Sequence, residues 1–273
     1  MQQTIAFIGG GNMAASLIGG LIAAGHPVER LRVAEPVAER ADWLRRQFGL
    51  EVRATAAEVV PGAGALVLAV KPQQMGEALA GLQADPGCVV ISVAAGVRLA
   101  RLRRALGEAA HYVRTMPNTP ALIGKGITGL YAVAGTPDAA RKLAEAVLAT
   151  AGATVWLNRE EDIDAVTALS GSGPAYFFLL TEALREAGEK LGLAPDTAAR
   201  LALHTFAGSA QMAAAEGARD VVELRAQVTS KGGTTEAAVK SLEAAGLRRS
   251  FDEALAAAAN RSRELGDLLD AQD

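Results

Sequence analysis

The pattern of apolar and polar positions divides the chain into two parts, and the first part alternates between two textures. Short runs of mostly apolar residues are separated by segments in which apolar residues recur every three or four positions. The runs cover Thr4–Ile8, Leu31–Ala34, Ala65–Val70, Val89–Val93, Tyr112–Thr115, Gly126–Val133 and Thr154–Leu157. Runs that are apolar throughout are typical of strands buried on both faces. The alternation predicts strand–helix–strand units around a parallel sheet, with helices that include Met13–Ala24, Val37–Phe48 and Pro137–Ala151.

The second part, from residue 159 onward, shows helical spacing without a convincing strand. The predicted helices cover Ile163–Leu169, Pro174–Leu191, Asp196–Glu216, Val221–Val228, Thr234–Ala245 and Arg249–Leu269. The acidic run Glu160–Asp162 is interpreted as a solvated start of the first of these helices. We therefore expect an α/β domain over residues 1–158, followed by an all-helical domain over residues 159–273.

Several of the later helices are apolar on more than one face, as in the run Tyr176–Leu180. A domain of about 115 residues has too little interior to bury so much apolar surface by itself. We therefore expect the helical domain to pack against a second copy of the chain, which makes a homodimer the working hypothesis.

Composition and charge narrow the classes of partner. Half of the residues are hydrophobic, 21% are charged, and the formal net charge is −3. This balance gives no electrostatic reason to expect nucleic acid or an anionic membrane as a partner. The chain has no secretory leader pattern and no run of about 18 apolar residues. Its single cysteine, Cys88, cannot form an internal disulfide, and its three histidines share no metal-ligand spacing. The expectation is a cytoplasmic protein with neither a metal nor a membrane partner.

A glycine-rich segment lies between the first predicted strand and the first predicted helix. It reads Gly9-Gly10-Gly11-Asn12-Met13-Ala14, which is the G-x-G-x-x-A form of the dinucleotide fingerprint. In this motif Gly9 permits a tight turn, Gly11 lets the backbone approach a pyrophosphate, and Ala14 lets the helix lie close to the strand. The free N–H groups that open the helix, at Asn12 and Met13, then face the phosphates.

The second predicted strand ends at Glu35, about 20 residues beyond the fingerprint, where an acid commonly binds the ribose 2′-hydroxyl of NAD. A 2′-phosphate would meet a like charge there, so Glu35 by itself favours NADH over NADPH. Arg40 lies within reach of a phosphate, but the sequence does not place it. The alternative is that Glu35 points into solvent.

Further candidate cofactor contacts follow the carboxyl ends of the later strands, where ligands bind in open α/β sheets. Lys71 and Pro72 follow one strand and offer a charge for a phosphate or a carboxylate. Small residues end the next strand and would let a nicotinamide ring lie against backbone, and Asn118 is a hydrogen-bond partner either for the cofactor or for a neighbouring loop. The segments concerned are Ala69-Val70-Lys71-Pro72, Ala94-Ala95-Gly96 and the rigid loop around Asn118.

A second glycine-rich segment, Val228–Thr235, precedes a predicted helix in the second part of the chain. Its two glycines expose backbone N–H groups that, with the helix dipole, can hold a carboxylate, and Ser230 adds a hydroxyl donor. The alternative is a simple Ser/Thr cap on the helix.

Six stretches of the sequence resemble successive motifs of the pyrroline-5-carboxylate reductases. They read FIGGGNMAASLIGGL, LAVKPQ, SVAAG, RTMPNTPA, DAVTALSGSGPAYFF and VTSKGGTTEAA, and they run from residue 7 to residue 238 in the family's order. The resemblance implies a Rossmann domain, a helical dimerisation domain, and reduction of a cyclic imine, 1-pyrroline-5-carboxylate, to proline with NADPH or NADH. It also implies dimers that often assemble into decamers, with an active site between subunits.

By the same resemblance, Ser230 and the backbone at Gly232, Gly233 and Thr234 hold the substrate carboxylate. Thr235 hydrogen-bonds the ring nitrogen, and it either orients the iminium or relays a proton from water. The family often favours NADPH and often has a small polar residue at the position of Glu35. This departure leaves NADH a serious candidate.

Three other interpretations remain open at the level of sequence. A β-hydroxyacid-type dehydrogenase also begins with such a fingerprint, but it uses a lysine on a long helix, and here Lys190 lies near that helix's end. The second interpretation is a reductase that acts on another imine. The third is a nicotinamide-binding sensor without turnover, which would not need Ser230 and Thr235.

Overall fold

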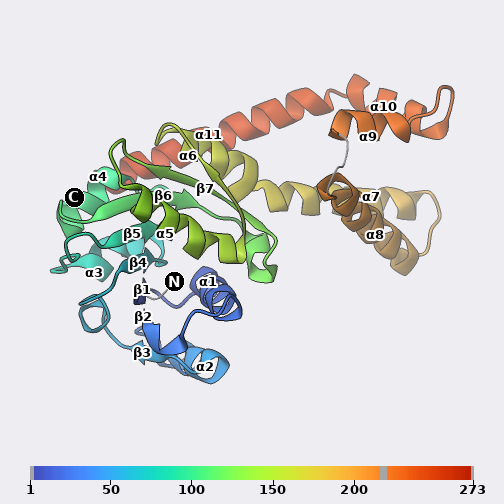
Figure 1. The fold of residues 1–273 in the computed structure, drawn as a ribbon. Coiled ribbons are helices and arrows are strands. Elements are labelled where there is room, and N and C mark those ends of the chain that lie inside the picture. Colours follow the sequence, from blue (N-terminus) through green and yellow to red (C-terminus); the bar gives the residue numbers. More distant parts are fainter. Residues whose placement is uncertain (1–2, 216–219, 272–273) are drawn as a thin grey trace. The chain divides into compact units, whose positions relative to one another are not determined.

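The computed structural model of the chain describes residues 3–215 and 220–271. It forms two compact units, one comprising Met1–Ser172 with Ala257–Asp273 and the other comprising Gly173–Ala256 (Figure 1).

The first unit is built on one eight-stranded sheet with helices on both faces. Its strands are β1 (Ile5–Ile8), β2 (Leu31–Ala34), β3 (Glu51–Arg53), β4 (Ala65–Leu68), β5 (Val89–Ser92), β6 (His111–Met116), β7 (Gly126–Ala132) and β8 (Gly152–Trp156). The spatial order is β3-β2-β1-β4-β5-β6-β7-β8, and the pairs are parallel except for the antiparallel pair β6–β7. The order reverses between β1 and β4, so a crevice for ligands is expected above the carboxyl ends of these two strands.

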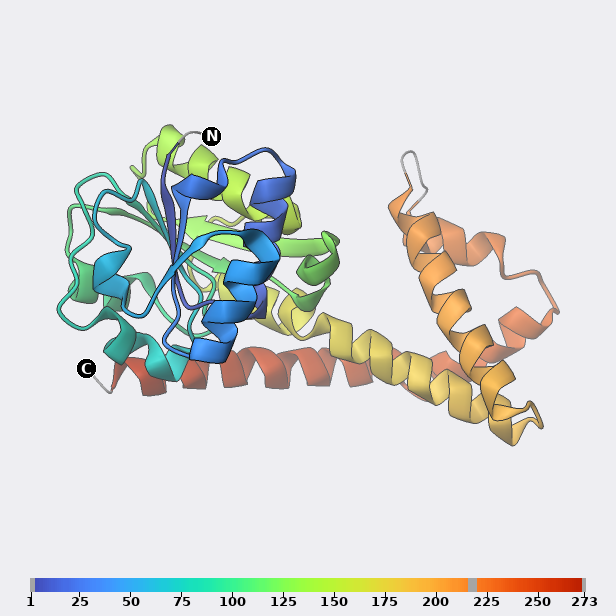
Figure 2. The ribbon, with the colours of Figure 1, turned by 90° about the horizontal axis from the view of Figure 1, so that it is seen from below.

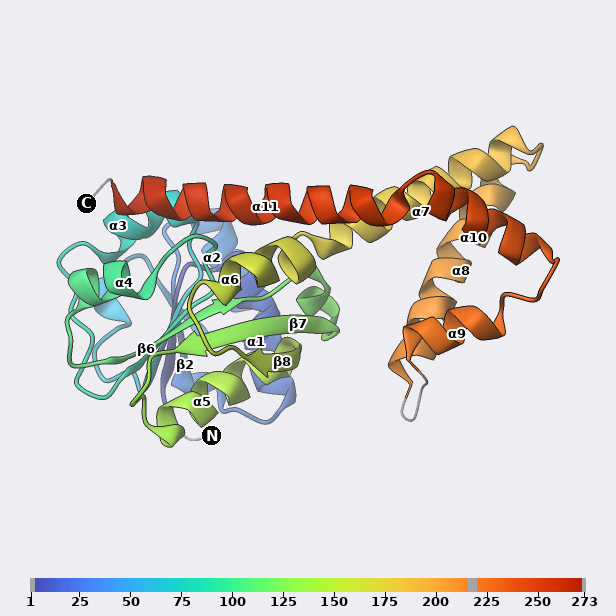
Figure 3. The same cartoon turned by 90° about the horizontal axis from the view of Figure 1, so that it is seen from above.

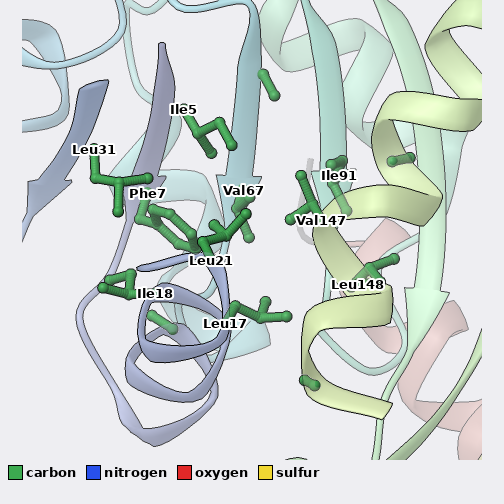
Figure 4. Close-up of a cluster of buried hydrophobic side chains, with 14 of the residues drawn as sticks. Ile5, Phe7, Leu17, Ile18, Leu21, Leu31, Val67, Ile91, Val147 and Leu148 are labelled. Carbon is green, nitrogen blue, oxygen red and sulfur yellow. The ribbon is translucent and has the colours of Figure 1, made fainter. Parts of the chain in front are cut away.

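Successive residues of the central strands feed two separate cores, because side chains alternate between the faces of a strand. On one face, Ile5 and Phe7 of β1 belong to a core that also contains side chains of α1 (Asn12–Ala23), α2 (Ala38–Phe48) and α5 (Asp138–Leu148). Figure 4 shows the part of this core formed with α1 and α5. On the other face, Ala6 and Ile8 join the core that contains α3 (Met75–Leu79), α4 (Leu99–Leu106) and the end of α11 (Leu247–Asp270) (Figures 2 and 3).

The predicted strands are confirmed, with boundary shifts of a few residues. The sequence did not predict β3, an edge strand of three residues of which only Val52 is buried. The helix expected to begin at Pro72 is present as a 3₁₀ turn followed by α3, whereas the sequence predicted neither the short helix α4 nor the reversal of direction at β7. A strand with one buried position leaves too little pattern to detect.

The second unit is helical, as predicted. It contains α7 (Gly173–Lys190), α8 (Pro195–Ala214), α9 (Val221–Gln227), α10 (Thr234–Ala244) and the first part of α11. Helices α7 and α8 pack together through the stacked rings of Phe177 and Phe206, whose centroids are 5.5 Å apart. Glu216, the predicted end of α8, lies outside the described residues.

The division between the units differs from the predicted boundary after residue 158. The first unit continues through α6 (Asp162–Val166), in which Ile163 is buried, and a π-helical turn at Thr167–Gly171. It also regains the last part of α11, because Ser262 donates a hydrogen bond of 2.6 Å to Asp164 and Arg98 forms ion pairs with Asp267 and Asp270. A contact that returns from the end of the chain leaves no mark in local periodicity.

Apolar side chains remain exposed on the helical unit, among them Phe178 and Leu179 on α7, each 64% exposed. The segment Asp162–Lys190 has the length and composition of a membrane span, but its α6 portion packs within the first unit. An exposed apolar face on α7 agrees with the expectation of a second copy of the chain.

Candidate active site

The predicted cofactor residues of the first unit gather at one edge of the sheet. They follow the carboxyl ends of β1, β2, β4, β5 and β6. Backbone hydrogen bonds tie these ends together: Gly9 donates to Ala34 O over 2.9 Å, and Ala69 donates to Ile8 O over 2.8 Å. The fold therefore brings the fingerprint and the residues after β2 and β4 to one place.

The first two glycines of the fingerprint are required by the local geometry. Gly9 has φ +94°, and a Cβ there would lie 2.8 Å from the Ala69 carbonyl oxygen. A Cβ on Gly10 would lie 2.4 Å from the side chain of Leu44. Gly9 permits the tight turn, as predicted, and Gly10 keeps the loop packed against α2.

Gly11 differs from the other two, because a Cβ there would meet no atom within 4 Å. It is the N-cap residue of α1, has extended backbone with φ −63°, and supplies no side-chain cap. The first turn of α1, at Asn12 and Met13, thus offers N–H groups without a capping side chain, and Ala14 is fully buried beneath them. This open, uncapped helix start fits a dinucleotide pyrophosphate.

Glu35 is bonded into the fingerprint loop and does not simply point into solvent. One carboxylate oxygen accepts the Gly10 N–H at 2.9 Å, and the other accepts the Val37 N–H at 2.9 Å. A carboxylate oxygen has further lone pairs, so Glu35 can still accept a ribose hydroxyl while it holds the loop.

Arg40 also contacts the loop. Its Nε donates to the Gly10 carbonyl oxygen over 2.6 Å, and its guanidinium carbon lies 4.2 Å from the centre of the Trp43 ring. The structure thus places the arginine whose position the sequence left open.

The residues after β4 remain candidates for the nicotinamide side of the site. Lys71 is exposed at the turn, and Pro72 begins a short 3₁₀ helix, Pro72–Gln74. Ala69 and Val70 lie directly against Gly9. Lys71 is therefore free to face a charged group of a ligand.

The segment after β5 is divided between two environments. Ala94 is buried and its N–H lies 3.4 Å from the Ser92 hydroxyl, whereas Ala95 is partly exposed. Gly96 has φ +76° and a Cβ there would lie 3.3 Å from Leu269 of α11. The end of α11 therefore covers the side of Gly96 on which a Cβ would lie, and contact of its backbone with the cofactor stays a prediction.

Asn118 holds neighbouring loops together, which was one of its two predicted roles. Its side-chain oxygen accepts the Ile127 N–H at 3.0 Å, and its amide nitrogen donates to the Ser170 carbonyl oxygen over 3.1 Å. Both ends of the amide are thus engaged by the protein, and a direct cofactor contact is no longer the simplest role.

The second glycine-rich segment precedes α10, as predicted, but its glycine N–H groups are not free. Gly232 donates to the carboxylate of Glu236 over 2.7 Å, and Gly233 donates to the Ser230 carbonyl oxygen over 3.0 Å. Thr234 and Thr235 open α10, and Gly233 supplies no side-chain cap. The donors left for a substrate carboxylate are therefore the first-turn amides at Thr234 and Thr235 and the hydroxyls of this segment.

Steric contact explains why glycine stands at position 233. A Cβ there would lie 2.5 Å from the Ser230 hydroxyl oxygen. Gly232 has φ +74°, which other residues rarely adopt. The segment can therefore place the Ser230 hydroxyl directly over the backbone that precedes α10.

Sequence reasoning missed Glu236 as part of this segment. The Gly232 N–H and the Lys240 side chain, 3.1 Å away, together lower the pKa of the Glu236 carboxyl. Its place three residues after the N-cap is a capping signal that the sequence does carry.

A buried polar cluster was also missed. Arg114, only 2% exposed, lies 3.2 Å from Glu160 and 3.6 Å from Asp164, and Glu160 also accepts the Leu99 N–H at 2.8 Å. Glu160 is therefore not part of a solvated run, as the sequence suggested. No local pattern links residues 114, 160 and 164 before the fold is known.

Two family models match the chain. The model described as pyrroline-5-carboxylate reductase dimerisation matches residues 160–265, and the model described as NADP oxidoreductase, coenzyme F420-dependent, matches residues 4–96. The first identifies most of the helical part as a dimerisation region, and the second agrees with a dinucleotide site at the fingerprint.

Relatives match along nearly the whole chain. The pyrroline-5-carboxylate reductase of Pseudomonas aeruginosa is 48% identical over 267 residues, which is 97% of each chain. The structure of the Coxiella burnetii pyrroline-5-carboxylate reductase is 40% identical with a TM-score of 0.90, covering 97% of this chain and 99% of that one. A Plasmodium falciparum pyrroline carboxylate reductase with NADP bound is 28% identical with a TM-score of 0.81, covering 97% and 98%.

Proposed function

The chain belongs to the pyrroline-5-carboxylate reductase family, and we propose that it reduces 1-pyrroline-5-carboxylate to proline as an oxidoreductase that uses a reduced nicotinamide dinucleotide. The observation that carries this proposal is the joint presence of both glycine-rich segments in a chain that is 48% identical to such an enzyme over 97% of its length.

The first segment binds the dinucleotide in this proposal. The cofactor, when bound, supplies the hydride for the imine carbon. Gly9, Gly11 and the uncapped start of α1 receive the pyrophosphate, and Ala14 keeps α1 close to β1. The residues after β4 and β5, from Ala69 to Pro72 and at Ala94 and Ala95, form the wall on which the reacting ring lies.

The second segment binds the substrate. The first-turn amides of α10 and the Ser230 hydroxyl hold the ring carboxylate, while the Thr235 hydroxyl hydrogen-bonds the ring nitrogen. Threonine is a poor acid, so Thr235 orients the iminium or passes on a proton from water. Positioning of this kind accounts for a large share of the catalysis of a hydride transfer.

NADH is the preferred cofactor in this proposal. The carboxylate of Glu35 is fixed by two backbone N–H groups, those of Gly10 and Val37. A ribose hydroxyl can donate to it, whereas a 2′-phosphate brings two negative groups together. The family model for NADP oxidoreductases and the NADP-bound relative leave both cofactors as candidates.

In this proposal the working form is a homodimer built through residues 160–265. The dimers assemble into a larger ring such as a decamer, and the substrate segment of one subunit completes the site of another. We place the reaction in the cytoplasm, where reduced nicotinamide dinucleotides are available. Light scattering on a size-exclusion column would report the mass, and a monomer that persists at all concentrations would contradict this part of the proposal.

The test is oxidation of NADH and of NADPH by purified protein in the presence of pyrroline-5-carboxylate, with proline identified as the product. We expect kcat/KM to be about tenfold or more higher with NADH, which corresponds to ~1.4 kcal/mol in the transition state. Binding of dinucleotide without oxidation would favour a sensor. Oxidation of NADH or NADPH only with the oxo compound that corresponds to a 3-hydroxy acid would favour the dehydrogenase class.

A further inference from the structure

The middle glycine of the fingerprint loop is held on both sides by charged side chains. Glu35 accepts the Gly10 N–H at 2.9 Å, and Arg40 donates through Nε to the Gly10 carbonyl oxygen at 2.6 Å. The two side chains lie 25 and 30 residues further along the chain.

These two bonds fix two consecutive peptide planes. The N–H of Gly10 belongs to the peptide that joins it to Gly9, and its carbonyl belongs to the peptide that joins it to Gly11. Because a peptide group is planar and trans, fixing the Gly10 carbonyl also fixes the direction of the Gly11 N–H on the opposite side. Three glycines in a row would otherwise leave this direction loosely defined.

The guanidinium of Arg40 contacts protein atoms on several sides. One face lies over Trp43 at 4.2 Å, Nε is bonded to Gly10, and Nη2 is buried without a hydrogen-bond partner within the described residues. A side chain that reads a 2′-phosphate would present its terminal nitrogens to solvent. In Arg40 a terminal nitrogen is covered.

We infer that Arg40 is a positioning residue for the dinucleotide: it orients the Gly11 N–H toward the pyrophosphate and so supports the binding of NADH and NADPH equally. This inference rests on the proposed dinucleotide site. It assigns the two charged residues different tasks, since Glu35 sets the cofactor preference and Arg40 sets the affinity for both cofactors.

The test compares Arg40→Met and Arg40→Lys with Arg46→Met. Arg46 lies on the same helix and is exposed, so its replacement makes the same change in charge without touching the loop. Dissociation constants for NADH and NADPH are measured by direct fluorescence titration, and kcat and KM are measured for both cofactors and for the imine. Thermal midpoints show whether each variant is folded.

For Arg40→Met we expect both dinucleotide dissociation constants to rise about tenfold or more, as for a lost bond to a charged donor. The ratio between the two cofactors, kcat and the imine KM should stay unchanged. Arg40→Lys should recover part of the affinity, because an ammonium can reach the same carbonyl with one donor. Arg46→Met should match the unaltered protein.

A loss confined to NADPH would overturn the inference and make Arg40 a reader of the 2′-phosphate. Unchanged affinity for both cofactors would also overturn it. If Arg40→Met does not fold, the same two outcomes are read from Arg40→Lys. The titration needs no turnover, so an inactive protein would refute the proposed reaction and still leave the role of Arg40 tested.

Discussion

The two glycine-rich segments of the molecule are built on the same local plan but are held in different ways. Each precedes a helix, and in each a glycine N–H is bonded to a glutamate carboxylate: Gly10 to Glu35 at 2.9 Å, and Gly232 to Glu236 at 2.7 Å. In the first segment the glutamate comes from the next strand of the sheet. In the second it comes from the helix that the segment itself begins.

This difference determines how rigid each segment is in a single chain. The first segment is bonded to Ala34 of β2, to Glu35 and to Arg40 of α2, and these bonds form only when the sheet is folded. The second is bonded to the neighbouring turns of α9, through Thr229, and to α10, through Glu236, and Ser230 and Gly232 are exposed. We therefore expect the cofactor segment to be ordered in the isolated subunit, and the substrate segment to gain its order from substrate and from a second subunit.

The largest effect should come from changes in the cofactor glycines. Gly9→Val adds a Cβ that would lie 2.8 Å from Ala69 O at a backbone φ of +94°, and such strain costs about 2 kcal/mol or more. We expect a lower thermal midpoint and loss of dinucleotide binding.

Gly11→Val is the matched comparison, because its Cβ has open space and its φ is −63°. This variant should fold with an unchanged midpoint and still bind dinucleotide at least tenfold more weakly, as measured by calorimetric titration. Unchanged affinity in Gly11→Val would mean that the pyrophosphate does not approach this residue.

The next effect concerns the substrate segment. Thr235→Ala removes the hydroxyl proposed to hold the ring nitrogen, and we expect kcat to fall on the order of 100-fold, at the lower end of general acid–base contributions. Thr235→Ser keeps the hydroxyl and should retain most of the activity. Dinucleotide affinity should be the same in both variants. Full turnover by Thr235→Ala in a steady-state assay would remove this residue from the mechanism.

A smaller effect is expected from the bond that closes the second segment. Glu236→Ala frees the Gly232 N–H, and we expect the imine KM to rise severalfold with the dinucleotide KM unchanged. The Gly232 N–H lowers the pKa of the Glu236 carboxyl, so this group is ionised at every pH above the usual range of carboxyl pKa values. The bond to Gly232 weakens only when the pH falls through that lowered pKa. The imine KM should therefore not vary with pH through this group between about pH 6 and 8.

The smallest effect concerns the first unit alone and is a dependence of its stability on pH. His26 follows α1, is 5% exposed, and neither ring nitrogen has a hydrogen-bond partner within the described residues. Burial lowers the pKa of His26 from its ordinary value of 6.5. As the pH is lowered, His26 therefore binds a proton at a higher pH in the unfolded chain than in the folded one. The free energy of unfolding consequently falls as the pH drops below about 6.5.

Unfolding of the protein in urea at pH 7.5 and 5.5, followed by a spectroscopic signal from the first unit, would measure this effect. His26→Gln should reduce the loss of stability at pH 5.5, whereas His204→Gln, which alters an exposed histidine of α8, should not. An equal pH response in all three proteins would show that His26 does not contribute.

The sequence predicted the elements and the local motifs well, because both depend on short-range pattern. The alternation of strands and helices, the fingerprint and the glycines before α10 are all visible in windows of a few residues. Relations that cross the fold were not predictable in this way. Arg40 on the Gly10 carbonyl, Leu269 over Gly96, and Glu160 beside Arg114 join positions 30 or more residues apart.

The differences between prediction and structure have the same origin. Gly96 follows a strand at the ligand edge, and only the return of α11 shows that the side on which its Cβ would lie is covered. The sequence predicts free glycine N–H groups before α10, but the carboxylate of Glu236, four residues after Gly232, accepts one of them. A capping glutamate at that spacing is visible in the sequence.

The most direct test of the central claim is the transfer of a deuterium label. The protein is incubated with pyrroline-5-carboxylate and with NADH that carries deuterium at the transferable position, and the product is analysed by mass spectrometry and NMR. The account predicts proline with one deuterium on the ring carbon that was double-bonded to nitrogen. Oxidised cofactor together with unlabelled proline, or no proline at all, would contradict it.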